Sequence, residues 1–392
     1  MERTQVAIIG AGPAGLTLSH LLARAGITSV VLESRSREYI ERRVRAGVLE
    51  QGTVDLLSEI GVADRLHREG MVHHGIELRF QGERHRIPLT DLAGGRSITV
   101  YGQQEVVKDL IQARLEAGGE IRFEAGAVTI QDLETTTPTV HYRQDGKVHA
   151  LQADFVAGCD GFHGVSRGAI PPGVLTAYDH TYPFAWLGIL AAAPPSVHEV
   201  TYAHHERGFA LYSMRSAEIS RLYLQVTPDE SLDNWPESRI WDELRTRLAT
   251  DDGFTLTDGP ILEQGITTMR SYVVEPMQYG RLYLAGDAAH IVPATGAKGL
   301  NLAVADVRIL ADGLVAWYGT GSAEQLDAYS QVCLRRVWRA QHFSNFMTTM
   351  LHRLPDDDPF QQRLQLSQLR YVTTSRAAAT SLAENYVGLE TV

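Results

Sequence analysis

The stretch between residues 5 and 33 constrains the fold of this chain more than any other part of its sequence. QVAII at 5–9 is apolar enough for a buried strand, GAGPAG follows at 10–15, an amphipathic helical run comes next, and SVVLE ends at Glu33. In such a unit the glycines let the backbone approach a pyrophosphate at the helix N-terminus, and the acid accepts hydrogen bonds from a ribose. The stretch therefore predicts a dinucleotide-binding βαβ unit.

The same stretch imitates a secretion signal, because Arg3 precedes an apolar run. The glycine spacing explains the run better, and cleavage would destroy the nucleotide site, so we expect no leader. Another apolar run, FAWLGILAAA at 184–193, is too short to cross a bilayer. A net charge of −11 without a Lys/Arg block argues against nucleic acid. The distant pair Cys159 and Cys333 argues against a metal centre or disulfide framework and suits a reducing cytoplasm.

Two later segments end an apolar strand in a turn that contains aspartate and glycine. DFVAGCDGFHGVSR at 154–167 contains Asp160, and GRLYLAGDAAHIVPATGAKGLNLA at 280–303 contains Asp287 and leads into a helix from about Leu300. A strand that runs into such a turn ahead of a helix N-terminus can build an anion and ribitol site. Taken alone, each pair is more often only a turn.

A predicted hairpin, YSMRSAEISRLYLQ at 212–225, places two arginines on alternating strands. Side chains two apart in a strand share a face, so Ser213 lies with Arg215, and Arg221 lies with Tyr223. If these faces look inward, the site is cationic, and a buried guanidinium suits a carboxylate held by two parallel hydrogen bonds. An exposed hairpin with solvated arginines explains this stretch equally well.

In order and spacing, the three nucleotide segments resemble those of the flavoprotein aromatic hydroxylases, which are single-component FAD monooxygenases. The resemblance runs essentially end to end and becomes closer at YGQQEV (101–106), AGCDGFHG (157–164), RSYVVEPMQYGRL (270–282) and ENYVG (384–388). It implies an α/β fold of the α+β kind. We expect a Rossmann-like FAD-binding domain at 1–175 with a piece at 73–100 on the substrate side, a mainly β substrate domain at 176–285, and a region at 286–392 that completes the flavin site and then turns helical.

The resemblance also assigns cofactor contacts. For FAD it implies Gly10, Gly12, Ala14, Gly15, Glu33, Arg43, Arg45, Gln103, Asp160, Arg221, Asp287, Leu300 and Asn301. Ala14 replaces a serine of a close relative, so a hydroxyl contact to phosphate is lost while the backbone N–H remains. For the nicotinamide it implies Ser34, Arg35, Tyr39, Arg43, Arg45, His163 and Arg270. Members restricted to NADPH carry Arg-Gln in place of Ser34-Arg35, so we expect NADH to serve at least as well as NADPH. Alternatively, these are solvated helix residues that decide nothing.

The implied reaction converts 4-hydroxybenzoate to 3,4-dihydroxybenzoate, using NADH or NADPH and O2 through a flavin C4a-hydroperoxide. In this family the hairpin forms a wall of the substrate pocket, which favours inward arginines. Ser213, Arg215 and Tyr223 would hold the carboxylate, and Arg221 would support movement of the flavin. Tyr202, Tyr386 and His73 would relay the phenol proton. Ala294 replaces a proline whose carbonyl lies by the phenol, so turnover of 3,4-dihydroxybenzoate to gallate is a second hypothesis.

Other classes stay open. A flavoprotein reductase or halogenase, or a flavin-bound aromatic sensor without enzymatic activity, could use the same nucleotide framework. The helical segment 335–354 places Trp338, His342, Asn345 or Phe346, and Met350 near one face. This face favours a homodimer, as in the relatives, over packing within one chain.

Overall fold

The computed structural model describes residues 2–43, 47–354 and 358–388. Its dinucleotide unit forms the centre of a sheet, because β1 (Glu2–Ile9) pairs in parallel with β2 (Ser29–Leu32) on one side and β11 (Lys147–Gly158) on the other. The sheet order is β17 (Gln278–Tyr279), β18 (Leu282–Leu284), β11, β1, β2 and β8 (Glu120–Arg122), with β9 (Gly126–Gln131) and β10 (Thr139–Gln144) attached to β11.

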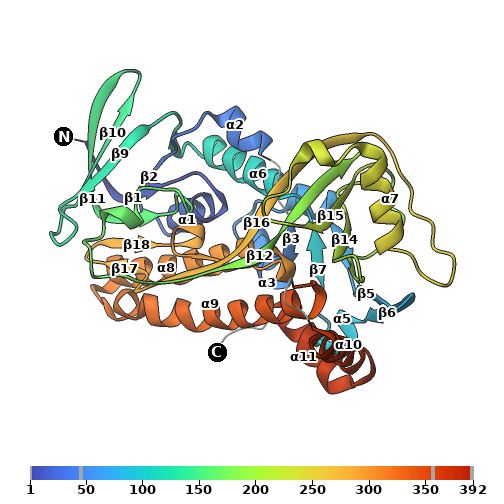
Figure 1. Ribbon diagram of the computed structural model, residues 1–392. Coiled ribbons are helices and arrows are strands. Elements are labelled where there is room, and N and C mark those ends of the chain that lie inside the picture. Colours follow the sequence, from blue (N-terminus) through green and yellow to red (C-terminus); the bar gives the residue numbers. More distant parts are fainter. Residues whose placement is uncertain (1, 44–46, 355–357, 389–392) are drawn as a thin grey trace.

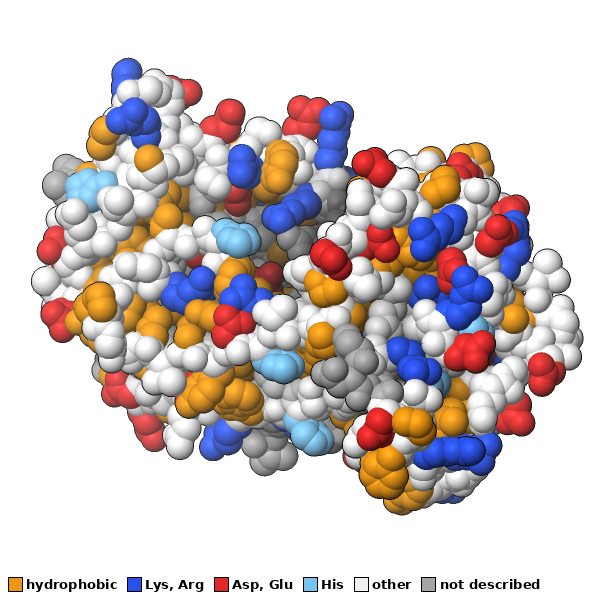
Figure 2. Space-filling model, viewed as in Figure 1, with side chains coloured by type: hydrophobic (Ala, Val, Ile, Leu, Met, Phe, Trp, Pro, Cys, Tyr) orange, Lys and Arg blue, Asp and Glu red, His pale blue; other side chains and the backbone are white. Residues whose placement is uncertain are grey.

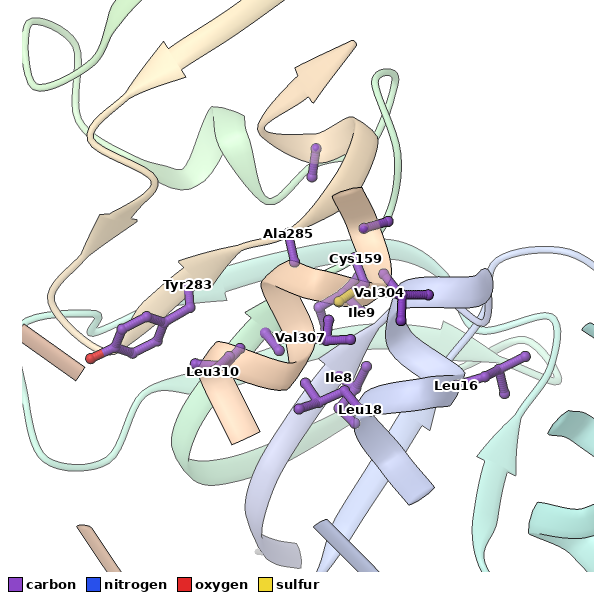
Figure 3. Close-up of a cluster of buried hydrophobic side chains, with 14 of the residues drawn as sticks. Ile8, Ile9, Leu16, Leu18, Cys159, Tyr283, Ala285, Val304, Val307 and Leu310 are labelled. Atoms are coloured by element: carbon purple, nitrogen blue, oxygen red, sulfur yellow. The ribbon is translucent and has the colours of Figure 1, made fainter. Parts of the chain in front are cut away.

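The core of this region lies between the sheet and the helices that cover it, which are α1 (Pro13–Arg24), α6 (Gln103–Glu116) and α8 (Gly299–Thr320). Figure 3 shows Ile8 of β1 and Leu18 of α1 close to Val307 of α8 in one cluster of buried side chains. These residues lie far apart in the sequence, so the cluster fixes α1 and α8 against each other beside the glycine turn.

A second sheet runs in the order β19 (His290–Ile291), β16 (Ile261–Glu275), β12 (Thr176–Ala191), β15 (Ser220–Val226), β14 (Ala210–Met214), β13 (Thr201–His204), β5 (Ile76–Phe80) and β6 (Glu83–Ile87). The long strands β12 and β16 run as a ribbon across the molecule (Figure 1). Helix α7 (Glu237–Arg247) covers one face, where Trp241 and Leu244 join its core.

A small third sheet joins β3 (Val48–Glu50), β7 (Ile98–Val100) and β4 (Met71–His73). The shorter helices are α2 (Arg37–Arg42), α3 (Gln51–Glu59), α4 (Asp64–Glu69) and α5 (Leu89–Leu92). The C-terminal region is helical: α9 (Glu324–Leu351) runs below the ribbon in Figure 1, and α10 (Pro359–Thr374) and α11 (Arg376–Val387) follow it. The predicted mixed α/β fold with a helical C-terminal region is thus confirmed. Among the described helices, none is long and apolar enough to cross a membrane.

Two details differ from the sequence expectations: the sheet in which residues 278–284 lie, and the burial of Met350. Residues 278–284, grouped with the substrate strands by sequence, lie in the first sheet, where β18 pairs in parallel with β11. The three residues of β18 are all buried, as expected for an inner strand of a parallel sheet. Met350 was expected on an exposed helical face, but it is 3% exposed and belongs to the second core cluster.

Candidate active site

The glycine turn after β1 leaves an open helix N-terminus. Gly10 has φ +103°, and a Cβ there would lie 2.4 Å from the Cys159 carbonyl oxygen. A Cβ on Gly15 would lie 2.0 Å from the Gly10 carbonyl oxygen. A Cβ on Gly12, by contrast, would meet nothing within 4 Å, and no side chain caps α1. The first backbone N–H groups of α1 therefore face open space, which suits a pyrophosphate.

Acidic side chains gather at the carboxyl ends of the parallel strands. Glu33 is buried, and its carboxylate accepts the backbone N–H groups of Ala11 at 2.9 Å and Arg35 at 2.8 Å. Asp160 accepts the N–H and hydroxyl of Ser166 at 2.9 Å each, and its Oδ1 is buried with no partner among the described residues. Burial raises the pKa of Asp160. Asp287 is exposed in the turn η3 (Gly286–Ala288), so it can accept from a ligand.

The other predicted FAD residues come from separate parts of the chain. Ala14 is buried opposite the Asp287 turn, since a Cβ on Gly286 would lie 3.7 Å from its Cβ. Gln103 begins α6 and is half-buried, Leu300 lies in the first turn of α8, and Arg43 is exposed. Arg45 lies outside the described residues. The groups present around the glycine turn fit a dinucleotide: free N–H donors, an acid at the ribose position, and an exposed acid after β18.

Asn301 is used differently from our expectation. Its side-chain amide donates to the carbonyls of Val48 and Ala297 at 3.0 Å each, and its Oδ1 accepts from the Glu50 N–H and the Thr53 hydroxyl. Because both the donors and the acceptor of this amide are used within the protein, the Asn301 side chain would have to leave these bonds to reach a ligand.

A buried ion pair that the sequence did not reveal lies beside Asn301. Lys298 Nζ donates to Glu50 Oε1 at 2.6 Å and to the Tyr386 carbonyl at 2.9 Å, and both charged side chains are below 10% exposed. Burial lowers the pKa of Lys298. The pair fastens the start of α8 to α11 and to the third sheet.

The predicted substrate residues share one face of the second sheet. Tyr202 of β13 is the register partner of Leu211, which is in turn the partner of Tyr223, and Ser213 is the partner of Arg221. Paired residues of antiparallel strands point to the same side, as do residues two apart in one strand. Tyr202, Ser213, Arg221 and Tyr223 therefore point to the same side of the sheet; the sequence had predicted only that Arg221 lies with Tyr223 and Ser213 with Arg215.

Arg215 is the most unusual group of this face. Its Nη1 donates to the Ser213 hydroxyl and to the Met214 carbonyl at 3.0 Å each, but its Nε is buried with no partner among the described residues. No ion pair joins it to an acid of the described chain, and burial lowers its pKa. Nη1 of Arg221 is buried and makes no hydrogen bond among the described residues, and its ion pair with Glu263 is long, at 3.9 Å. A half-buried guanidinium with a buried, unpartnered Nε and no ion pair among the described residues, as at Arg215, favours an anionic ligand.

Two residues that sequence reasoning missed shape this face. A Cβ on Gly188 of β12 would lie 2.9 Å from Nη2 of Arg221 and 3.2 Å from the ring of Tyr223, so only glycine leaves room for both. His352 is stacked on Phe209 and accepts the Trp186 indole N–H at 2.7 Å. Its Nδ1 lies 2.9 Å from the Thr348 carbonyl, and burial lowers its pKa to about 3. The neutral ring of His352 therefore holds Trp186 by a hydrogen bond and Phe209 by stacking.

The two predicted relay tyrosines are in direct contact. Their hydroxyl groups are 2.5 Å apart, and both side chains are 1% exposed. Burial raises the pKa of Tyr202 and of Tyr386 well above the usual range. Tyr202 also donates to the carbonyl of Thr295 at 3.2 Å. Ala294, the residue we expected there, is exposed, and its carbonyl instead accepts the Ala297 N–H at 3.0 Å.

His73 is buried at the end of β4. Its Nδ1 accepts the Val200 backbone N–H at 3.3 Å, its Nε2 is buried with no partner among the described residues, and burial lowers its pKa to about 4. The ring is therefore neutral near pH 7, with its proton on Nε2.

The nicotinamide candidates lie in two groups. Around α2, Arg37 pairs with Glu41 at 2.6 Å, Arg42 pairs with Glu38 at 2.8 Å, and Arg35 lies over the Tyr39 ring. Ser34 donates to Glu33 at 3.3 Å. In the second group, Arg270 pairs with Asp179 and lies over Phe162, while His163 is exposed.

Comparison with known proteins decides the family. A family model for the FAD binding domain matches residues 3–344. The p-hydroxybenzoate hydroxylase of Acinetobacter baylyi is 47% identical over 387 residues, which cover 99% of this chain and 96% of that protein. The chain belongs to the flavoprotein aromatic hydroxylases. As a member of this family it is an FAD-dependent monooxygenase, and the dinucleotide fit of its glycine turn agrees with that cofactor.

Solved structures of flavoprotein monooxygenases share the fold of this family member. The p-nitrophenol 4-monooxygenase PnpA from Pseudomonas putida superimposes with a TM-score of 0.82 over 100% of both chains at 22% identity. The aklavinone-11 hydroxylase, in a ternary complex with FAD and aklavinone, superimposes with a TM-score of 0.74 at 22% identity over 90% of this chain and 70% of that one.

Proposed function

We propose that the chain hydroxylates 4-hydroxybenzoate at carbon 3 to give 3,4-dihydroxybenzoate, using NADH or NADPH and O2. One observation carries the proposal: the same sheet face holds the half-buried cation Arg215, whose buried Nε has no partner among the described residues, and the buried tyrosine pair that begins at Tyr202. An acid with a phenol on the opposite side of its ring offers a partner to each. The A. baylyi relative, named for this substrate, supports the same assignment.

Bound FAD supplies the oxygen chemistry. The protein binds and orients the ring: Arg215, Ser213 and Tyr223 hold the carboxylate, and Trp186 with Phe209 forms an aromatic wall. Tyr202 accepts the phenol proton and passes one to Tyr386. Loss of this proton assists hydroxylation, because the phenolate has a higher electron density at the carbon beside its oxygen. His73 is the proposed outer end of this path: it would take up the proton at Nδ1 after leaving the Val200 N–H and release its Nε2 proton outward. The buried aromatic surroundings exclude water.

Coenzyme oxidation with and without 4-hydroxybenzoate tests this function. We expect oxidation to be stimulated strongly by the aromatic acid, with one hydroxylated product formed for each coenzyme oxidised. Oxidation that is independent of the aromatic acid would support a reductase. Aromatic binding without turnover would support a sensor, and a halogenated product in the presence of halide would support a halogenase.

The coenzyme is proposed to be NADH at least as readily as NADPH. A ribose 2′-phosphate needs free cations, but Arg37 and Arg42 of α2 are each held by a glutamate one helical turn away. Arg35, which precedes α2, has no such glutamate partner among the described ion pairs, and its backbone N–H donates to the Glu33 carboxylate. Turnover of 3,4-dihydroxybenzoate to gallate is a weaker second proposal, which rests on the exposed Ala294 lacking the rigid ring of proline.

We further propose a homodimer in a reducing cytoplasm. A groove of about 420 Å³ lies where β12, β16 and α9 meet, lined by Tyr178, Tyr182, Trp338, His342 and Asn345 among others. Trp338 is 40% exposed and Tyr178 46% exposed, and Figure 2 shows hydrophobic and histidine side chains gathered along α9. A second copy of this chain is the proposed occupant, and Trp338→Glu should shift the sedimentation of a dimer to that of a monomer. The two cysteines are free, which suits the reducing compartment.

A further inference from the structure

Asp306, a buried acid on α8, contacts both ends of the turn at 286–290, which carries Asp287. Asp306 Oδ2 accepts the Gly286 backbone N–H at 2.9 Å and lies 2.6 Å from His290 Nε2. The side chains of Asp306 and His290 are 2% and 1% exposed. A carboxylate buried this deeply is costly unless donors surround it, so its place on an otherwise apolar helix face needs a reason.

The turn cannot be replaced by an ordinary one. Gly286 has φ +62°, and a Cβ there would lie 3.0 Å from the Cβ of Ala303 on α8. Its conformation directs the N–H group inward to Asp306, while Asp287, the next residue, stays exposed. The close approach of α8 and the bond to Asp306 together fix the direction in which the Asp287 carboxylate points.

The other end of the turn belongs to the second sheet. His290 begins β19 and is the register partner of Val273 in β16. Burial by itself lowers the pKa of His290, but Asp306 and, to a smaller extent, Asp287 raise it, and the net shift is upward. The opposite charge of Asp306 thus favours the protonated form of His290, and the bond between the two side chains links the second sheet to α8.

We propose that Asp306 and His290 are positioning residues for FAD, which hold the turn at 286–290 so that Asp287 faces the ribityl chain. The inference rests on the proposed contact between Asp287 and FAD. Neither residue touches the flavin; they act through the turn. Removing the charge of Asp306 loosens the turn, so FAD binds less tightly even where the rest of the fold persists.

The test compares FAD release with unfolding in the full-length holoenzyme. Asp306→Asn keeps the size of the side chain and an acceptor for the Gly286 N–H, and His290→Gln keeps a donor to Asp306 without a charge. FAD release is followed by flavin fluorescence during heating, unfolding by circular dichroism, and the FAD dissociation constant by dilution of the holoenzyme. We expect either variant to release FAD well below its unfolding temperature and to raise the dissociation constant at least tenfold.

Glu243→Gln is the matched control. It breaks another buried pair, Glu243 with Arg247 on α7, whose side chains are 8% and 6% exposed. This variant should lower both temperatures together and leave the dissociation constant within twofold. If Asp306→Asn and His290→Gln behave like the control, the positioning role is wrong. Asp287→Ala separates the two proposals. Unchanged FAD affinity in that variant refutes the contact between Asp287 and FAD. Weakened affinity in Asp287→Ala together with normal affinity in Asp306→Asn refutes only the positioning role of Asp306 and His290.

Discussion

Replacing Arg215 tests the substrate assignment most directly. Arg215→Met keeps much of the side-chain volume and removes the charge that has no acidic partner among the described residues. A buried ion that loses its partner costs about 3–5 kcal/mol. The Ser213 hydroxyl and Tyr223 can still donate to a carboxylate, so we expect about 3 kcal/mol. Since each 1.4 kcal/mol is tenfold, the dissociation constant of 4-hydroxybenzoate should rise about a hundredfold.

The assay is a titration of the oxidised holoenzyme, followed by flavin absorbance, with two ligands. 4-Hydroxybenzoate carries the carboxylate, and 4-hydroxybenzamide is its neutral counterpart. Arg215→Met should weaken binding of the acid about a hundredfold and binding of the amide less than about threefold, because the charge interaction is lost only for the acid. Arg245→Met, at an arginine 45% exposed on α7, is the control and should change neither. Equal losses for both ligands would show that Arg215 supports the fold and does not bind the carboxylate.

Four further outcomes follow from the same geometry. Tyr386→Phe, which removes one hydroxyl of the 2.5 Å pair, should lower kcat for hydroxylation by roughly a hundredfold with little change in KM, measured as product formed. The ratio of kcat/KM for NADPH to that for NADH should be below about tenfold, and Glu41→Gln, which frees Arg37, should raise it. Ala294→Pro should abolish any gallate formed from 3,4-dihydroxybenzoate, as judged by product analysis. Burial lowers the pKa of His73 from 6.5 to about 4 and that of His352 to about 3, so below pH 6.5 the unfolded chain binds more protons and the folded state loses stability as the pH is lowered. At pH 5 each histidine costs about 2 kcal/mol. Between pH 7.5 and pH 5, measured by urea unfolding, His352→Gln should therefore lose about 2 kcal/mol less stability than the wild type.

The nucleotide unit could be predicted because its signal is local. Strand, glycine turn, helix and acid follow one another within residues 5–33, and Gly15 allows a close approach to the Gly10 carbonyl inside that unit. That Arg221 lies with Tyr223, and Ser213 with Arg215, could also be predicted, since alternation along a strand decides which side chains lie together. Both arguments need only the order of residues along one short stretch.

The rest of the site depends on contacts between distant segments. Lys298 and Glu50 are 248 residues apart, and Tyr202 and Tyr386 are 184 apart. Nothing in the sequence near Asn301 tells that its amide is already bonded to Val48 and Ala297. A glycine in an apolar strand could have pointed to Gly188, because such a residue often marks the close approach of another group. We expected the carbonyl of Ala294 beside the tyrosines, but Tyr202 donates to that of Thr295, the next residue. In a tight turn the orientation of a single peptide decides which carbonyl oxygen faces a neighbouring group, and the sequence does not reveal it.

In the relay that we propose, the tyrosine pair would pass a proton by turning its hydroxyl groups rather than by holding a charge. Burial raises the pKa of both tyrosines, so a tyrosinate inside the protein is disfavoured near neutral pH. Tyr202 can donate either to the Thr295 carbonyl or to Tyr386, and each choice leaves a lone pair free on its other side. Accepting the phenol proton requires Tyr202 to donate toward Tyr386, which requires it to leave the Thr295 carbonyl. The negative charge then rests on the bound phenolate, where it assists hydroxylation, and the high pKa of the two tyrosines keeps it there.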